Sequence, residues 1–443
     1  MCRRQKAFAT VALVLAMILP ASLAAQSSQR ALRRTLKDVP LGSEWIDGDL
    51  DLAVQQAGAT GRPLLVAFRC VPCEACRVFD AQVVRRVDAQ LAALLDGFVC
   101  VRIVQCWDMN LQAFQFDFDL SWAVVFMHPD KTVYGRYGTR SSRADAEKDI
   151  SIEGFKQAMS GALELHDAYP QNRTSLQGKQ VRPPRWLKPQ DIPALRRRFS
   201  RPATGRRDCI HCHDVQGALV QSFRHAGRPI PEQLLWPYPM PDQLGLAMDA
   251  GQRATVASVG DGSPAQDAGF QNEDVIVTLG AQPILSTADI QWVLHHAADE
   301  DHLVANVQRG TESLRLTLRL PRGWRATGDL SWRASTQHVL RIDMLGLMKM
   351  APMPIQDRLR LGLKKDEMAF PVSIPPDWLR TGNMAARRLL RHGDVIVGVD
   401  GRTDAMTESQ LLVYLAREKR PGQSVEITVL RNSQRRNVQL TLK

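Results

Sequence analysis

Short apolar runs, separated by polar, glycine-rich or proline-rich segments, recur along this chain of 443 residues. Short runs rich in β-branched side chains predict buried strands, and apolar residues three or four positions apart predict helices. In the first third of the chain, these patterns predict strands at 63–68, 98–104, 123–126 and 133–137 and helices at 77–86 and 152–166. This alternation indicates an α/β module over residues 43–168.

The second half of the chain carries one pattern twice. The first copy has predicted strands at 254–259, 273–277, 303–308 and 314–320 and a predicted helix at 287–296. Its segment Asp274-Val-Ile-Val reappears 120 residues later as Asp394-Val-Ile-Val, again followed by a predicted helix, at 408–417, and two strands. The repeat predicts two related α+β domains, at 243–321 and 340–443, which a linker at 322–339 connects.

The N-terminus has the pattern of an export signal. Arg3, Arg4 and Lys6 precede an apolar run at 7–21, and small residues follow at 22–25. A segment of this kind is removed on export, so residues 1–25 are expected to be a signal peptide cleaved near Ala25. The mature protein is then periplasmic or otherwise exported. An uncleaved membrane anchor is the alternative.

Cys73 and Cys76 belong to a Cys-Glu-Ala-Cys motif between a predicted strand and a predicted helix. A helix N-terminus stabilises a thiolate through its dipole and its unpaired N–H groups. The order of strand, motif and helix resembles the thioredoxin family, which implies an α/β sandwich with Cys73 as nucleophile and Cys76 as resolving thiol. In place of the family's cis-proline, this chain has Ser121 or Trp122. Cys70 adds a third thiol, which would permit disulfide shuffling or a soft-metal site.

A second motif, Cys209-Ile-His-Cys212-His213, has the form C-x-x-C-H of c-type haem attachment. Cys209 and Cys212 would bind the haem vinyl groups, and His213 would be the proximal iron ligand. Met240, between two prolines, is the predicted distal ligand, with His225 as competitor. A disulfide, a bare dithiol or a zinc site are the alternatives, although zinc would need a second pair of ligands. We expect haem c.

The net charge of +11 is concentrated in one proline-rich segment. Between Arg173 and Asp208 there are eleven Lys or Arg and two Asp or Glu, a net charge of +9. This composition predicts a basic linker at 169–242, in which the short haem-binding segment lies. We expect a solvated linker; docking to an acidic partner or to anionic lipid is the alternative. Nucleic acid is not an expected partner, and membrane contact is expected only through the signal segment or this linker.

The two repeated domains resemble PDZ domains. In the first copy the resemblance rests on the turn Gly262-Ser-Pro-Ala, the stop Ala268-Gly269 and the strand that begins at Asp274. The family has partly open β-barrels with helices, and it binds a peptide C-terminus by strand addition, with backbone N–H groups around the carboxylate. The resemblance implies that this loop is made by Leu244, Gly245, Leu246 and Ala247. The second copy is irregular over 370–376, which predicts an altered groove.

Together these patterns indicate an exported multidomain redox protein of α/β and α+β class. Its dithiol and haem would transfer electrons, and its PDZ domains would recruit a protein partner or a peptide C-terminus. A thiol–disulfide oxidoreductase activity is possible in this scheme, whereas a serine protease is not expected, since no Gly-x-Ser-Gly-Gly segment is present. The alternative is a non-enzymatic scaffold in which PDZ domains recruit and the cysteine pairs are structural.

Overall fold

The computed structural model describes residues 31–35, 38–71, 76–142, 145, 148–199, 209–345, 350–351, 353–373 and 389–442. The predicted signal peptide lies outside these residues. The chain divides into two compact units, one containing residues up to Cys212 together with Met240–Trp324, the other containing His213–Pro239 and Arg325–Lys443. No helix among the described residues is long and apolar enough to cross a membrane.

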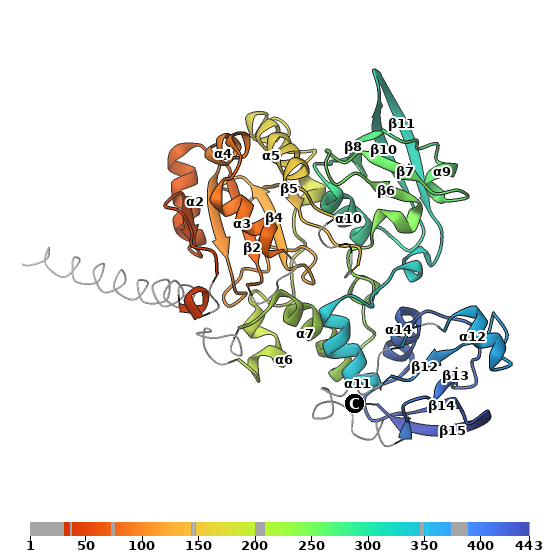
Figure 1. Cartoon of the computed structure of the whole chain (residues 1–443). Coiled ribbons are helices and arrows are strands. Elements are labelled where there is room, and N and C mark those ends of the chain that lie inside the picture. Colours follow the sequence, from red (N-terminus) through yellow and green to blue (C-terminus); the bar gives the residue numbers. More distant parts are fainter. Residues whose placement is uncertain are drawn as a thin grey trace, which may run out of the picture. The chain divides into compact units, whose positions relative to one another are not determined.

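A five-stranded sheet with the order β1-β3-β2-β4-β5 forms the first module of the first unit (Figure 1). Strands β1, β3 and β2 are parallel, and β4 and β5 run antiparallel beside β2. The strands are β1 (Trp45–Asp47), β2 (Leu64–Arg69), β3 (Val99–Ile103), β4 (Trp122–Met127) and β5 (Val133–Tyr137). Strands β2 to β5 are buried at every position, which confirms the strands predicted from their apolar runs.

This sheet is accompanied by α2 (Leu50–Thr60), α3 (Arg77–Arg85), α4 (Ala89–Asp96) and α5 (Ile152–Asp167), and residues 31–35 form a further helical segment. Helices α3 and α5 were predicted from the spacing of their apolar residues. Each of the other two begins at a capping aspartate, Asp49 for α2 and Asp88 for α4, whose carboxylate accepts backbone N–H bonds from the first turn. Phe155 of α5 is fully buried against Trp122 and Phe126 of β4.

Part of the basic proline-rich segment is folded onto the first unit. It contains η1 (Gln177–Lys179), η2 (Pro189–Asp191) and α6 (Pro193–Arg196). Apolar side chains between its charged residues are buried, including Leu176, Ile192 and Leu195. The expectation of a solvated linker is therefore wrong for these residues, because burial of the interspersed apolar side chains compensates the entropy lost on ordering.

The first repeated domain completes the first unit. Its strands are β6 (Leu246–Met248), β7 (Val256–Val259), β8 (Val275–Leu279), β9 (Gln282–Pro283), β10 (Asp301–Arg309) and β11 (Glu312–Leu320). Its short helix is α9 (Pro264–Asp267), the turn η4 (Pro241–Leu244) precedes β6, and the long helix is α10 (Thr287–His296). Helix α10 is buried on both sides: Ile290 packs in the core of this domain, while Leu285, just before the helix, belongs to the core of the five-stranded sheet.

The second unit is built on the four-stranded sheet β12-β13-β14-β15. Its strands are β12 (Phe370–Pro371), β13 (Val395–Val399), β14 (Ser424–Arg431) and β15 (Gln434–Thr441). Its helices are α7 (Cys212–His225), α8 (Glu232–Leu235), α11 (Ile342–Leu345), α12 (Ile355–Arg360) and α14 (Glu408–Glu418). One core joins side chains of α7, α11 and α14 to the sheet, for example Val220, Met344 and Leu411.

The predicted repeat extends to a buried ion pair. Asp274, which precedes β8, accepts two bonds from Arg309 of β10, at 2.7 and 2.8 Å. Asp394, which precedes β13, accepts two from Arg431 of β14, at 2.7 and 2.6 Å. The repeated aspartate therefore holds the turn that enters β8 or β13, which is a structural role.

Candidate redox site

The first cysteine segment lies where β2 ends and α3 begins. Cys70 directly follows β2, and Cys76 is the N-cap residue of α3. The predicted nucleophile Cys73 lies outside the described residues, whereas the predicted resolving thiol Cys76 is buried at 7% exposure. The strand, motif and helix therefore follow one another in the predicted order.

Ser121 connects Cys70 and Cys76 to the start of β4. Its hydroxyl lies 3.0 Å from the sulfur of Cys76, and its carbonyl accepts the backbone N–H of Cys70 at 2.8 Å. The sequence placed Ser121 or Trp122 where the thioredoxin family has its cis-proline. It is Ser121 that contacts the thiol, and the indole N–H of Trp122 instead donates to Asp80 at 3.0 Å.

A buried charge network fixes α3 beneath this site. Asp80, one turn after Cys76, accepts bonds from Arg102 of β3 and lies 3.6 Å from the guanidinium of Arg69. Arg102 also bonds Asp38 at 2.6 Å. Because a buried carboxylate with several charged donors is costly to displace, the network holds the N-terminal end of α3 in place.

The C-x-x-C-H segment lies against the same end of the sheet, which sequence reasoning did not anticipate. The backbone N–H of Cys106 donates to the carbonyl of Ile210 at 3.0 Å. The sulfur of Cys106 is 3.3 Å from that of Cys212, and the sulfur of Cys70 is 3.3 Å from Nδ1 of His211. The two cysteine segments are far apart in sequence, but in the first unit they form one thiol cluster, which we define as Cys70, Cys76, Cys106, Cys209 and Cys212.

The thiols of the cluster differ in their environment. The contact with Cys212, together with burial, raises the pKa of Cys106 well above its usual range. Cys106 is therefore a protonated thiol at neutral pH and a poor nucleophile. Cys70 is half-buried and beside an imidazole that can take its proton, which is the usual arrangement of an activated cysteine.

Cys100 belongs to the core of the sheet. It is buried on β3, and burial raises the pKa of its thiol to about 12. Its sulfur contacts the carbonyl of Leu95 at 3.7 Å. It is therefore a small apolar core residue that can serve as a control for the thiol cluster.

Haem attachment would require Cys209 and Cys212 to present both sulfurs to a porphyrin. Cys209 is 1% exposed and packs against Leu32, Val71 and Val104, and Cys212 faces the thiol of Cys106. His213 follows in the first turn of α7. Among the described residues, both sulfurs therefore contact other protein side chains.

The predicted distal ligand Met240 is engaged elsewhere. Its sulfur accepts a hydrogen bond from the hydroxyl of Thr139 at 3.3 Å, and that hydroxyl also contacts Gln291 of α10. Within the part of the chain that the structure describes, no group of three or more His, Cys, Asp or Glu side chains is arranged to hold a metal ion.

The residues of the predicted peptide-binding loop lie at the end of η4 and the start of β6. Gly245 adopts a positive φ of 87°, a conformation that favours glycine, and its carbonyl accepts the N–H of Gly260 at 2.9 Å. Leu244 and Leu246 are buried, while Ala247 is half-buried. Among the described strands, β6 pairs with β7 on one edge alone, so its other edge can take an added strand.

Comparison with known families identifies the modules. A thioredoxin-like family model matches residues 44–129, and a PDZ domain model matches residues 233–320 and 380–442. The chain therefore contains a thioredoxin-like domain and two PDZ domains, in a multidomain protein of mixed sheets and helices. The corresponding expectations for fold class and family resemblance are confirmed.

Individual relatives match short parts of the chain. The human serine protease HTRA4 is 30% identical over 116 residues, 24% of this chain and 22% of the relative. A probable periplasmic serine endoprotease DegP-like from Halomonas elongata is 38% identical over 81 residues, 18% of this chain and 16% of the relative. This chain thus spans about a fifth of the length of these curated relatives.

Two solved structures are similar over limited regions. The PDZ domain of HtrA3 bound to a phage-derived ligand has 26% identity and a TM-score of 0.14, over 15% of this chain and 60% of that chain. The HtrA-type protease AlgW with a decapeptide has 21% identity and a TM-score of 0.18, over 31% of this chain and 41% of that chain.

Proposed function

We propose that this chain is an exported thiol–disulfide exchange protein whose PDZ domains hold a protein partner by a peptide C-terminus. The observation that carries the proposal is the convergence of two cysteine segments on one end of the thioredoxin-like sheet. Cys70 and Cys76 both contact Ser121, and Cys106 contacts Cys212. A purely structural pair of thiols would not need two further cysteines and a histidine around it.

The exchange proceeds through the Cys73–Cys76 dithiol. The Cys73 thiolate attacks a substrate disulfide and forms a mixed disulfide, and one substrate thiolate leaves. Cys76 then attacks the sulfur of Cys73, which releases the second substrate thiolate and leaves a Cys73–Cys76 disulfide. Two electrons pass to the substrate, and its thiolates take up the two protons lost by the dithiol.

The second pair can restore the first. Cys106 and Cys212 are two thiols at 3.3 Å, and their oxidation to a disulfide supplies the two electrons and two protons that return Cys73–Cys76 to the dithiol. Cys70 has its sulfur 3.3 Å from Nδ1 of His211 and its backbone N–H bonded to the carbonyl of Ser121, and it can carry the exchange as a mixed disulfide. The thiol cluster is therefore a relay.

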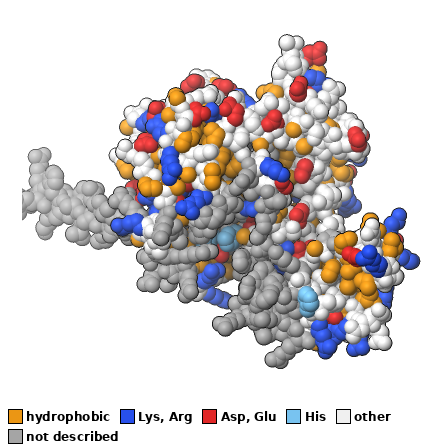
Figure 2. Space-filling view, in the orientation of Figure 1, with side chains coloured by type: hydrophobic (Ala, Val, Ile, Leu, Met, Phe, Trp, Pro, Cys, Tyr) orange, Lys and Arg blue, Asp and Glu red, His pale blue; other side chains and the backbone are white. Residues whose placement is uncertain are grey.

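Exposed apolar residues that follow Cys76 in the chain support a protein substrate. Hydrophobic side chains gather on the face formed by the helices of the thioredoxin-like domain (Figure 2). Val78, two residues after Cys76 on α3, is 68% exposed, and Val87 after the same helix is 60% exposed. Exposed apolar residues of this size next to a reactive site suit contact with another protein.

The test is reduction of insulin disulfides by the full-length protein with dithiothreitol as electron source. Activity that falls to background in Cys73→Ser and Cys76→Ser, but not in Cys100→Ala, supports the proposal. Absence of activity in the unaltered protein, with its fold intact, would favour the scaffold in which the thioredoxin-like domain is structural.

Covalent haem at Cys209 and Cys212 remains a prediction of the C-x-x-C-H motif, with His213 as the proximal ligand. A pyridine haemochrome spectrum of protein exported from a host with c-type haem maturation tests it. A spectrum that disappears in Cys209→Ser would assign this segment to electron transfer and remove Cys212 from the thiol relay. Two titratable thiols without haem would support the relay.

A further inference from the structure

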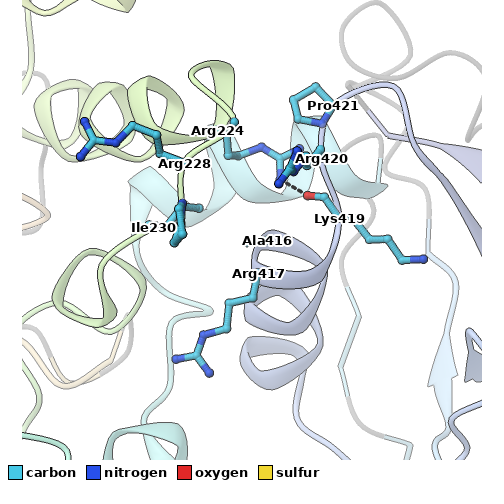
Figure 3. Close-up of a pocket in the computed structure, with 10 residues that line it drawn as sticks. Arg224, Arg228, Ile230, Ala416, Arg417, Lys419, Arg420 and Pro421 are labelled. Atoms are coloured by element: carbon cyan, nitrogen blue, oxygen red, sulfur yellow. Dashed lines mark hydrogen bonds between the residues drawn. The ribbon is translucent and has the colours of Figure 1, made fainter.

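A cavity of about 270 Å³ lies in the second unit, between the C-terminal ends of α7 and α14 (Figure 3). Residues of the PDZ fold form one side of it, and the segment around the end of α7, which lies outside that fold, forms the other. Its polar lining is cationic, with five basic residues: Arg224, Arg228, Arg417, Lys419 and Arg420. No Asp or Glu lines it.

The charges of this cavity are only partly balanced by neighbouring carboxylates. Arg417 pairs with Glu232, and the ammonium of Lys419 lies 2.8 Å from Asp400. Among the described residues, Arg228 and Arg420 form no ion pair, and both are exposed. The cavity therefore has at least two positive charges that no acidic side chain of the described residues neutralises.

One guanidinium is held inside the cavity. Arg224 is 5% exposed and donates to the carbonyl of Lys419 at 3.4 Å, next to the end of α14. Figure 3 shows Arg224 reaching the carbonyl of Lys419, with the labelled Arg420, Ile230 and Ala416 also lining the cavity. The guanidinium of Arg224 therefore places a fixed positive charge at the cavity wall.

Interaction with helix ends accounts for some of these residues. Basic side chains are favoured at helix C-termini, where they compensate the dipole and bind the last carbonyls, and Arg224 and Arg417 have this role. Arg420 is beyond the end of α14, and Arg228 is beyond the end of α7. Arg228 lies over the ring of Phe223, with its guanidinium carbon 5.4 Å from the ring centroid. Neither helix capping nor an ion pair among the described residues thus accounts for Arg420.

We propose that this cavity binds a small oxyanion, a phosphate or carboxylate group on a compact molecule. Guanidinium groups bind these planar or tetrahedral oxyanions through paired N–H donors. A cavity of about 270 Å³ is slightly smaller than the sites of about 300 to 1,000 Å³ that hold drug-sized ligands, so it suits a ligand of a few heavy atoms. Ile230 and Ala416 offer it an apolar floor.

Isothermal titration calorimetry on the full-length protein tests this site, with pyrophosphate and citrate as probes at constant ionic strength. We expect saturable binding of at least one probe, and the preferred probe identifies the phosphate or the carboxylate as the recognised group. Arg420→Gln should weaken binding about tenfold, since it removes a charged hydrogen-bond donor from the cavity. Arg228→Gln should weaken it less, because the guanidinium of Arg228 lies over the ring of Phe223.

Arg436→Gln is the matched control, because it removes one exposed positive charge from β15, outside the cavity. Binding that is unaffected by this control but lost in Arg420→Gln establishes the site. Equal weakening by Arg436→Gln and Arg420→Gln would mean general attraction to a basic protein and would overturn the proposal. Failure of both probes to bind would overturn it as well.

Discussion

Lys179 and Asp289 form an ion pair in the interior of the first unit. The ammonium of Lys179 is 2.9 Å from Oδ1 of Asp289, and both side chains are at most 1% exposed. The carboxylate of Asp289 also accepts the backbone N–H groups of Arg136 and Leu285, at 3.2 and 3.0 Å. One aspartate thus connects the thioredoxin-like sheet, the segment after it and the first PDZ domain.

Removal of this carboxylate should loosen the first PDZ domain from the thioredoxin-like domain. Asp289→Asn leaves Lys179 buried without its counter-charge, and breaking a buried pair by loss of one partner costs about 3 to 5 kcal/mol. We expect a loss of this order in the free energy of unfolding from urea titrations. Glu300→Gln, an exposed change just after α10, is the control and should have almost no effect.

The double variant Lys179→Met/Asp289→Leu should recover most of that loss. A buried ion pair replaced by apolar residues of similar volume is often neutral or stabilising, since the desolvation of both charges is avoided. If the double variant is as unstable as Asp289→Asn, the backbone bonds that Asp289 accepts, and not the charge pair, hold the interface.

The same pair predicts a rise in stability at alkaline pH. Burial lowers the pKa of Lys179 to about 8, although Asp289 acts in the opposite direction. Between this value and the ordinary value of 10.5, the unfolded chain holds a proton that the folded chain has lost. The unfolded state then binds more protons, so the free energy of unfolding increases with pH in this range.

Urea titrations at pH 7.5 and pH 9.5, on the wild type and on Lys179→Met, measure this contribution. The stability of the wild type relative to the variant should be greater at pH 9.5. Burial also raises the pKa values of Tyr134 and Tyr137, which reduces stability at still higher pH, so the comparison stays below pH 10. If the stability of the wild type relative to Lys179→Met decreases from pH 7.5 to pH 9.5, the lowered pKa of Lys179 is contradicted.

Local patterns predicted most of the fold, because strands and helices such as β5 and α10 are determined by the spacing of their own apolar residues. Helix α2 was missed, since alanine and glutamine fill much of it and its buried residues are the small Ala53 and Ala57. The thiol cluster was missed for another reason. Cys106 and Cys212 are 106 positions apart, and no local pattern in the sequence indicates a contact of that separation.

Acid should weaken the second unit through Asp394. Burial would raise the pKa of Asp394, but hydrogen bonds from Arg431 and from the backbone of Arg391 outweigh it and lower the pKa below the ordinary 3.8. A carboxyl whose folded pKa is lowered contributes stability above its unfolded pKa and loses it as the pH falls. Between pH 6 and pH 3, the urea concentration at the midpoint of unfolding should fall less in Asp394→Asn than in the wild type. The exposed control Asp366→Asn should behave as the wild type does.

Cys106 and Cys212 should form a disulfide under mild oxidation. Their sulfurs are 3.3 Å apart, so a small movement brings them to the bonding distance of about 2.05 Å. With oxidised glutathione as oxidant, each thiol loses one hydrogen and two glutathione molecules are released.

Peptide mapping of the oxidised, unreduced protein should find the peptides of Cys106 and Cys212 joined, and Cys212→Ser should abolish this cross-link. Cys100, buried in the sheet, should remain a thiol throughout. A bond between Cys209 and Cys212 in place of this one would mean that the C-x-x-C-H segment is a self-contained pair, and the relay would then have no partner for Cys106.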